Sequence, residues 1–390
     1  MTAPLDPLGL SPAGFESLAL AWGLPRYRGG QLFDAVHRRR ARDYSALAEL
    51  PKSLRERLAG ELPIRLPEIA RREAAADGSV KYALRLADGA LVEAVYMPGD
   101  ASRSAVNEFD DARREPTGRR GGGATGRRPK DSPVTRFTVC LSSQTGCAVD
   151  CVFCVTGRLG GGRNLTAGEI VGQLYAVLDD ARRPTEGLRI VFMGMGEPFL
   201  NPDGVLDALE VLFALVSPRR VTVSTSGITP AFGRFAGLSR RPNLAVSINA
   251  PDEETRARLM PITRTYPLTG LLAAMRAWPL EPRRRILVEY VLIAGENDTP
   301  EAARKLARLL SGLRVKVNVI PLNEDPVHLP GLSRPSEEAI ERFVKVLADA
   351  RVTVTVRRSK GPDVAAACGQ LKGRAEDVRK GRKERPLLSS

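Results

Sequence analysis

The chain from residue 137 onward alternates short β-rich runs with segments of helical spacing. The β-rich runs are residues 137–142, 188–193, 220–225, 243–248, 286–292, 315–320 and 352–356. Between them, segments such as 167–181, 301–313 and 336–350 space apolar residues at three and four. Strands separated by helix-sized crossovers predict βαβ units and a parallel sheet. Six or seven strands favour an open, partial (βα) barrel of the α/β class over a closed eight-unit barrel.

The earlier part of the chain follows two other patterns. Residues 12–62 have helical spacing with breaks at Gly29-Gly30 and Pro51, which predicts a small all-α module. Residues 67–98 alternate more like strands, as in 81–86 and 91–96 around Asp88-Gly89, so we expect a hairpin leading into the main domain. The glycine, arginine, aspartate and proline content of 107–136 predicts a disordered insertion. The expected domains are 1–66 (helical), 67–106 (hairpin linker), 107–136 (insertion), 137–372 (barrel) and 373–390 (basic tail).

Composition adds a question about charge. The 390 residues are 43% hydrophobic and 27% charged, as in a globular protein, with no apolar run long enough to span a membrane. A net charge of +14 indicates either a polyanionic partner or a merely arginine-rich composition. The charge gathers near both ends, which favours phosphate-binding arms or faces. The residues are Arg26, Arg28, Arg38, Arg39, Arg40, Arg42, Arg55 and Arg57, and in the tail Lys372, Arg374, Arg379, Lys380, Arg382, Lys383 and Arg385.

A cysteine triplet directly follows the first predicted strand of the barrel. Cys147, Cys151 and Cys154 form a C-x3-C-x2-C run, which can hold three irons of a four-iron cluster and leave the fourth open to a small molecule. Structural zinc requires four ligands, and neither His37 nor His328 is placed to supply the fourth. Five cysteines without a secretory signal fit a reducing, cytoplasmic compartment better than a disulfide framework. The spacing therefore favours an iron–sulfur cluster.

Polar or glycine-rich turns follow the other predicted strands. They contain Gly196 and Glu197, Ser224, the run Ser247-Ile248-Asn249, and Asn323. Each turn alone is an even choice between a ligand site and ordinary loop chemistry. Together they lie where the carboxyl ends of parallel strands form a binding rim. A fourth cysteine, Cys368, follows the last strand among small residues, although a lone cysteine is usually an inert buried thiol.

Five segments in order resemble the RlmN/Cfr-type radical S-adenosylmethionine (SAM) RNA methyltransferases. They are residues 142–147, 163–170, 193–198, 224–227 and 366–371. The resemblance implies a partial (βα) barrel that methylates an adenosine carbon, at carbon 2 in RlmN and carbon 8 in Cfr. Its implied substrates are 23S rRNA and, for RlmN, certain tRNAs; residues 163–170 look closer to RlmN. A non-catalytic RNA-binding paralogue and a radical SAM enzyme acting on a peptide or small molecule are the alternatives.

The same resemblance implies a role for each candidate residue. Cys147, Cys151 and Cys154 would hold a [4Fe-4S] cluster that cleaves SAM to a radical, with electrons from a flavodoxin-like donor. Cys368 would carry the methyl group, Glu93 would remove a proton from the RNA adduct, and Cys140 would release the product by forming a disulfide with Cys368. The implied SAM contacts are Gly196, Glu197, Ser224, Ser247, Ile248, Asn249 and Asn323. We expect the enzyme to be a monomer.

Three features depart from the family pattern, and two residues allow a plainer interpretation. Asn249 stands where the family usually has histidine, and residues 159–163 lack the usual aromatic residue after the cluster loop. The insertion separates Glu93 from Cys140 by more residues than is typical. Cys140 can equally be a core residue of its strand, and Glu93 an exposed strand carboxylate.

Overall fold

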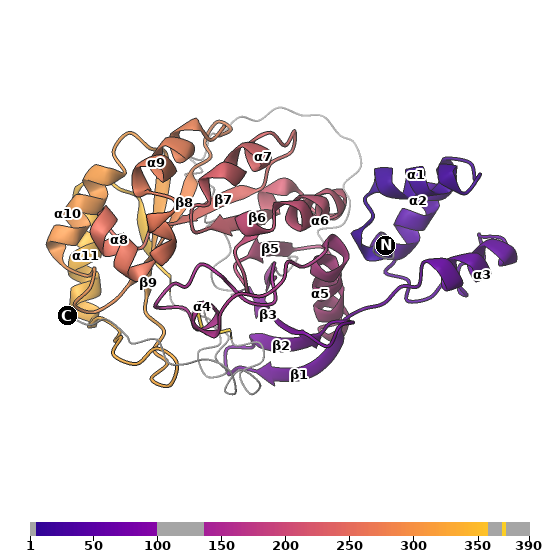
Figure 1. Cartoon of the computed structure of the whole chain (residues 1–390), viewed down its shortest axis with the longest axis horizontal. Coiled ribbons are helices and arrows are strands. Elements are labelled where there is room, and N and C mark those ends of the chain that lie inside the picture. The colour runs from indigo at the N-terminus through magenta and orange to yellow at the C-terminus, as the bar shows by residue number, and fades with distance from the viewer. Residues whose placement is uncertain (1–4, 100–135, 358–368, 372–390) are drawn as a thin grey trace, which may run out of the picture.

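The computed structural model describes residues 5–99, 136–357 and 369–371, and its strands form one ten-stranded sheet (Figure 1). Its strands, in the order β1 to β10, are Glu68–Ala74, Val80–Arg85, Leu91–Pro98, Phe137–Cys140, Leu188–Phe192, Val221–Thr225, Asn243–Ser247, Ile286–Leu292, Val315–Pro321 and Val354–Val356. The α-helices α1 to α11 are Pro12–Ala21, Tyr27–Phe33, Lys52–Glu61, Val155–Leu159, Ala167–Asp180, Pro202–Leu215, Phe232–Ala236, Glu253–Leu259, Leu268–Ala277, Pro300–Leu309 and Glu337–Asp349.

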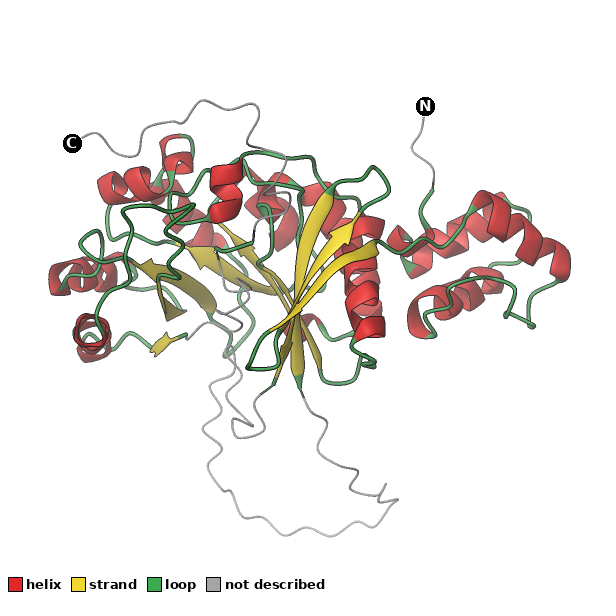
Figure 2. Cartoon of the chain, turned by 90° about the horizontal axis from the view of Figure 1, so that it is seen from below, coloured by secondary structure: helices red, strands yellow, loops and turns green. Residues whose placement is uncertain are grey.

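The predicted open barrel is confirmed. Strands β4 to β10 pair in parallel, each with its neighbour in chain order, and helices such as α5, α10 and α11 lie where helical spacing was predicted. In the described part of the chain, β10 pairs only with β9 and β1 only with β2, so the sheet stays open at both edges (Figure 2). Each parallel strand's carboxyl end therefore faces the same edge of the sheet.

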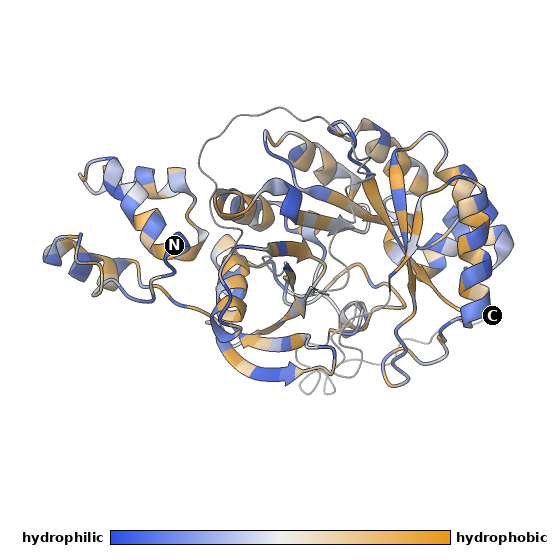
Figure 3. Ribbon diagram, turned by 180° about the vertical axis from the view of Figure 1, so that it is seen from behind, coloured by the Kyte–Doolittle hydropathy of each residue, from blue (hydrophilic) through white to orange (hydrophobic). Residues whose placement is uncertain are grey.

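The pairing register separates two faces of this sheet. Val139, Ile190, Val223, Val246 and Val288 lie on one face and belong to the main hydrophobic core, together with residues of the covering helices. The opposite face, called the inner face below, carries smaller and polar side chains. Its members are Cys140, Val191, Thr222, Ser224, Ala245, Ser247, Glu289, Asn318 and Thr355. Figure 3 shows the apolar character of the strands beside the hydrophilic stripes of the outer helices.

The N-terminal helices differ from prediction at one point. Gly29 and Gly30 lie inside α2 and do not break it. A β-carbon at Gly29 would lie 2.5 Å from Cα of Glu16, so this glycine lets α2 pack directly against α1. The expected break at Pro51 is confirmed, because α3 begins at Lys52.

The helical module is fixed to the barrel through α5, beside which it lies in Figure 1. The buried His37 ring contacts the Tyr175 hydroxyl (Nδ1 to Oη, 2.7 Å) and the Leu10 carbonyl (Nε2 to O, 3.0 Å). Burial lowers the pKa of His37 to about 4, so the ring is neutral near pH 7. Arg42 forms an ion pair with Asp179 at the end of α5.

The predicted hairpin is confirmed as β2 and β3, with Gly89 at a φ of 82° in its turn. A further antiparallel strand, β1, precedes it, and β3 pairs with β4. The hairpin thus continues the barrel's own sheet. Residues 107–135 of the expected insertion, Cys368 and the tail from 372 lie outside the described residues. Among the helices that are described, none is both long and apolar enough to cross a membrane.

Candidate active site

The cysteine loop lies between β4 and α4 and is closed by backbone contacts. Cys147 donates its N–H to the Gly160 carbonyl at 2.9 Å, and Cys154 donates to the Cys151 carbonyl at 3.1 Å. A β-carbon at Gly146 would lie 2.6 Å from the Gly160 oxygen. The glycine run 160–162 therefore lets the backbone pass directly against Gly146 and Cys147, with no side chain between the two segments. This run belongs to the segment that lacks the family's usual aromatic residue.

The three thiols of this loop match the donor set of an iron–sulfur cluster. All three are half-buried. Burial is the main cause that raises the pKa of Cys147 and of Cys151, and the negative charge of the Cys154 thiolate raises both further. In the described residues, no three His, Cys, Asp or Glu side chains converge to bind one metal ion. A four-iron cube spreads three thiolates over three irons, so they need not meet at one point. Its positive irons would also hold the cysteines as thiolates despite their burial.

Glu197 connects the ends of β5 and β6. Its Oε2 accepts hydrogen bonds from the backbone N–H and the hydroxyl of Ser226, both at 2.7 Å, and its Oε1 accepts from the Phe199 N–H at 2.9 Å. Burial raises the pKa of Glu197, while these hydrogen bonds oppose the shift. The carboxylate thus stabilises the rim itself, and its contact with the SAM ammonium group stays a prediction.

The glycines beside Glu197 let the chain after β5 pass close to the chain after β4. A β-carbon at Gly194 would lie 2.7 Å from the Leu141 backbone, and one at Gly196, whose φ is 94°, would lie 2.5 Å from Gln144. The Glu197 N–H also donates to Gln144 Oε1 at 2.8 Å. Chain packing therefore requires these glycines, whether or not Gly196 also contacts a ligand.

Asn249 is held at the carboxyl end of β7 by β8 and the loop that follows it. Its Oδ1 accepts from the Val291 N–H at 2.8 Å, its carbonyl accepts from Asn297 Nδ2 at 2.7 Å, and its φ is 57°. Asparagine tolerates this left-handed conformation better than most residues. Of its neighbours, Ser247 lies half-buried on the inner face, but the Ile248 side chain is fully buried in the main core. A contact of Ile248 with SAM would therefore come from its backbone, and that contact stays a prediction.

Arg256 organises this rim, although no sequence pattern singled it out. The side chain is fully buried and donates to the carbonyls of Ser226 (Nη2 to O, 2.6 Å) and Ile248 (Nε to O, 3.1 Å), and to Thr263 Oγ1 at 2.8 Å. It thereby links the carboxyl ends of β6 and β7. Burial lowers the pKa of Arg256.

Glu93 and Cys140 share the inner face. Val95 pairs with Cys140 across β3 and β4, and Glu93 lies two residues from Val95, so these side chains point the same way. Glu93 is fully buried, which contradicts the interpretation of it as an exposed carboxylate. Ser142 Oγ donates to the Glu93 carbonyl at 2.6 Å. Two predicted SAM contacts remain. Ser224 lies near the carboxyl end of β6, Asn323 follows the end of β9 by two residues, and both are half-buried.

The segment that follows Cys368 is docked against the cysteine loop. The Gly369 carbonyl accepts from the Val155 N–H at 2.7 Å, and the Leu371 carbonyl accepts from Thr156 Oγ1 at 2.7 Å. The Leu371 side chain packs in a small cluster with Cys140 and Val95. Residues 369–371 thus join the helix of the cluster loop to the strand that carries Cys140.

Comparison with known proteins agrees with this geometry. The model of the radical SAM superfamily matches residues 141–310. A probable dual-specificity RNA methyltransferase RlmN of Koribacter versatilis is 43% identical, covering 90% of this chain and 96% of its own length. The RlmN of Sorangium cellulosum is 41% identical over 95% of this chain and 96% of its own length. This chain belongs to the RlmN family.

The structural comparison extends the assignment to nearly the whole fold. A radical SAM methyltransferase from Sphaerobacter thermophilus superposes with a TM-score of 0.79 at 40% identity, covering 95% of this chain and 99% of that structure. As an RlmN-family member, the chain is a radical SAM RNA methyltransferase, and the family implies SAM and a [4Fe-4S] cluster as its cofactors.

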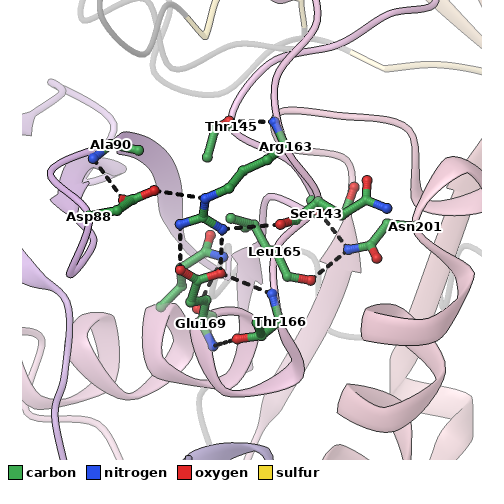
Figure 4. A network of polar contacts seen from close by, with 11 residues as sticks. Asp88, Ala90, Ser143, Thr145, Arg163, Leu165, Thr166, Glu169 and Asn201 are labelled. Carbon is green, nitrogen blue, oxygen red and sulfur yellow. Dashed lines mark hydrogen bonds and ion pairs between the residues drawn. The ribbon is translucent and has the colours of Figure 1, made fainter. Parts of the chain in front are cut away.

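In this RlmN-family chain, Arg163 joins the cluster loop to the hairpin that carries Glu93 (Figure 4). Its guanidinium donates to both carboxylate oxygens of Glu169, at 2.8 and 2.6 Å, and to Asp88 in the β2–β3 turn at 2.7 Å. The Glu169 and Thr166 side chains form a reciprocal cap at the start of α5. The segment 163–170 is therefore a clamp that holds the cluster loop, the hairpin turn and α5 together.

Proposed function

We propose that this chain methylates carbon 2 of adenosine in 23S rRNA and in tRNA, with Cys368 as the methyl carrier. The observation that supports this most is the docking of Gly369–Leu371 on the cluster-loop helix and against Cys140. Cys368 immediately precedes this segment, and the relatives' name, dual-specificity RNA methyltransferase, fits two classes of RNA.

The three loop cysteines hold the cluster, and Ser224, Ser247, Asn249 and Asn323 lie at the rim where SAM would bind. When bound, the cluster and SAM supply a carbon radical able to remove a hydrogen atom from a methyl group. A low-potential donor of the flavodoxin type provides the electron. The rim residues orient SAM, while Arg256 and Glu197 keep the strand ends in place.

The protein's own groups then carry the methyl group and release the product. The Cys368 thiolate attacks the methyl carbon of one SAM, so that a sulfur–carbon bond forms on Cys368 and S-adenosylhomocysteine leaves. After hydrogen removal, the sulfur-bound carbon forms a bond with adenine carbon 2. Glu93 accepts the proton that adenine carbon 2 loses, and the unpaired electron of the adduct returns to the low-potential electron carrier. The Cys140 thiolate then attacks the Cys368 sulfur: a disulfide forms, the sulfur–carbon bond to the RNA adduct breaks, and the released carbon takes up a proton to become the methyl group.

The test is anaerobic reconstitution with iron, sulfide, SAM and a chemical reductant, using rRNA and tRNA fragments in parallel. Mass spectrometry of the digested nucleosides should show 2-methyladenosine in both RNAs, identified against synthetic 2-methyl and 8-methyl standards. Formation of 8-methyladenosine alone would contradict the proposed carbon. RNA that stays unmethylated although the enzyme holds a full cluster would contradict the catalytic role altogether.

A further inference from the structure

Arginines gather at the amino edge of the parallel strands, opposite the edge that carries the cysteine loop. The loops that lead into β6, β7, β8 and β9 contain eight arginines and one carboxylate, Glu281. We call these arginines the arginine edge: Arg219, Arg220, Arg240, Arg241, Arg283, Arg284, Arg285 and Arg314. Because the four strands are parallel neighbours, their amino ends lie side by side.

Hydrogen bonds join these loops in two pairs, and the ion pair of Arg219 with Glu281 at 3.2 Å links the two pairs. Asn243 Nδ2 donates to the Arg219 carbonyl at 2.9 Å, and the Ile286 N–H donates to the Arg314 carbonyl at 3.0 Å. Arg314 Nη2 donates to the Leu280 carbonyl at 3.1 Å. Adjacent strands are about 4.8 Å apart, so four of them spread the charge over about 14 Å.

Three arginines of the arginine edge lack a carboxylate partner among the described residues, whereas several arginines of the helical module are paired. In the helical module, Arg26 pairs with Glu16 at 2.6 Å, and Arg57 pairs with Glu61 at 3.0 Å. Arg38, Arg39 and Arg42 also have carboxylate partners. By contrast, Arg220, Arg240 and Arg283 are exposed and have no carboxylate within ion-pair distance among the residues that the structure describes.

The backbone at Arg283 supports a use for its side chain. Its φ is 65°, a left-handed conformation that costs a residue other than glycine roughly 1 kcal/mol or more. Glycine or asparagine would fit this position with less strain.

We propose that the arginine edge binds the phosphate backbone of the RNA substrate at a distance from the adenosine being methylated. A single small anion would require guanidinium groups that converge on one point. A row about 14 Å long instead matches a polyanion that carries one charge per about 1.7 Å of duplex. This inference depends on the proposed RNA substrate and extends it to a second contact surface, remote from the cluster.

The test compares two triple variants of the anaerobically reconstituted, full-length enzyme. The first is R220A/R240A/R283A; the control, R26A/R234A/R304A, removes the same charge from exposed arginines that pair with Glu16, Asp203 and Glu301. Dissociation constants for a long rRNA fragment are measured at several salt concentrations. Removing one phosphate contact lowers the salt slope by about 0.7 to 0.9, so the slope of the first variant should fall by about 2 and its binding should weaken at least about tenfold.

Two further readouts separate this inference from the proposed function. The methylation rate at saturating RNA should equal that of the wild type, because the arginine edge lies away from the cluster. The inference would be overturned if the salt slope of RNA binding were unchanged in the first variant, or if both variants bound RNA equally weakly. An unchanged salt slope is also the result expected if the arginine edge binds an acidic protein instead of RNA. Failure of the wild type to methylate RNA would instead count against the proposed function and leave the binding comparison valid.

Discussion

Cys151→Ala is expected to give a folded protein that holds no intact four-iron cluster and methylates no RNA. The cluster loop has three thiols, and Cys147 and Cys151 both lie within electrostatic range of Cys154, so the variant leaves only two of the three loop ligands. The visible absorption, the iron and sulfide content and the turnover after anaerobic reconstitution measure the effect.

The matched control for this variant is Cys140→Ser. Cys140 is also buried but lies on β4 outside the loop, in contact with Leu371 and Val95. The Cys140→Ser variant should keep the full cluster absorption but should not release the methylated RNA. A Cys151→Ala protein with wild-type iron and sulfide would contradict the assignment of this thiol to the cluster.

Arg256→Met should lower the free energy of unfolding by about 3 to 5 kcal/mol, because it leaves buried carbonyls at the ends of β6 and β7 without their charged donor. The Ser226 and Ile248 carbonyls both accept from this guanidinium. The change is measured by denaturant unfolding of the anaerobic protein. SAM affinity should fall as well, since Ser247 and Asn249 belong to the same rim.

Arg258→Met provides a control on the same helix. Arg258 is 41% exposed and pairs with Glu254 and Glu296 at the surface, so its loss should change stability by less than about 0.5 kcal/mol. If Arg256→Met were no more destabilising than Arg258→Met, the role of Arg256 as the link between strand ends would be wrong.

The sequence predicted the barrel well because its periodicity is local. Each β-rich run of 137–356 corresponds to a strand, and strands that follow one another in the chain are neighbours in the sheet because short crossovers join them. The strand-like pattern of 67–98 predicts a hairpin but not a third strand, because β1 within that range is mostly exposed and charged. Gly29 illustrates the reverse error, because a glycine required by helix packing has the same appearance in a sequence as one that ends a helix.

The site was predicted in outline, but the residues that support it were missed. The cysteine loop and the polar strand ends are contiguous motifs, so spacing alone revealed them. Arg256 lies in the charged run Glu253-Glu254-Thr255-Arg256, which is typical of a solvated helix face. Its burial depends on carbonyls that only the folded sheet brings together. The same holds for Glu197, whose partner Ser226 is 29 residues away.

The most direct test of the account is the number of deuterium atoms in the adenosine methyl group formed from SAM with a trideuterated methyl. If Cys368 carries the methyl group and one of its hydrogens is removed before the carbon joins adenine, the product should contain no more than two deuterium atoms. A methyl group that arrives with all three would show direct transfer from SAM to RNA and would contradict the carrier role.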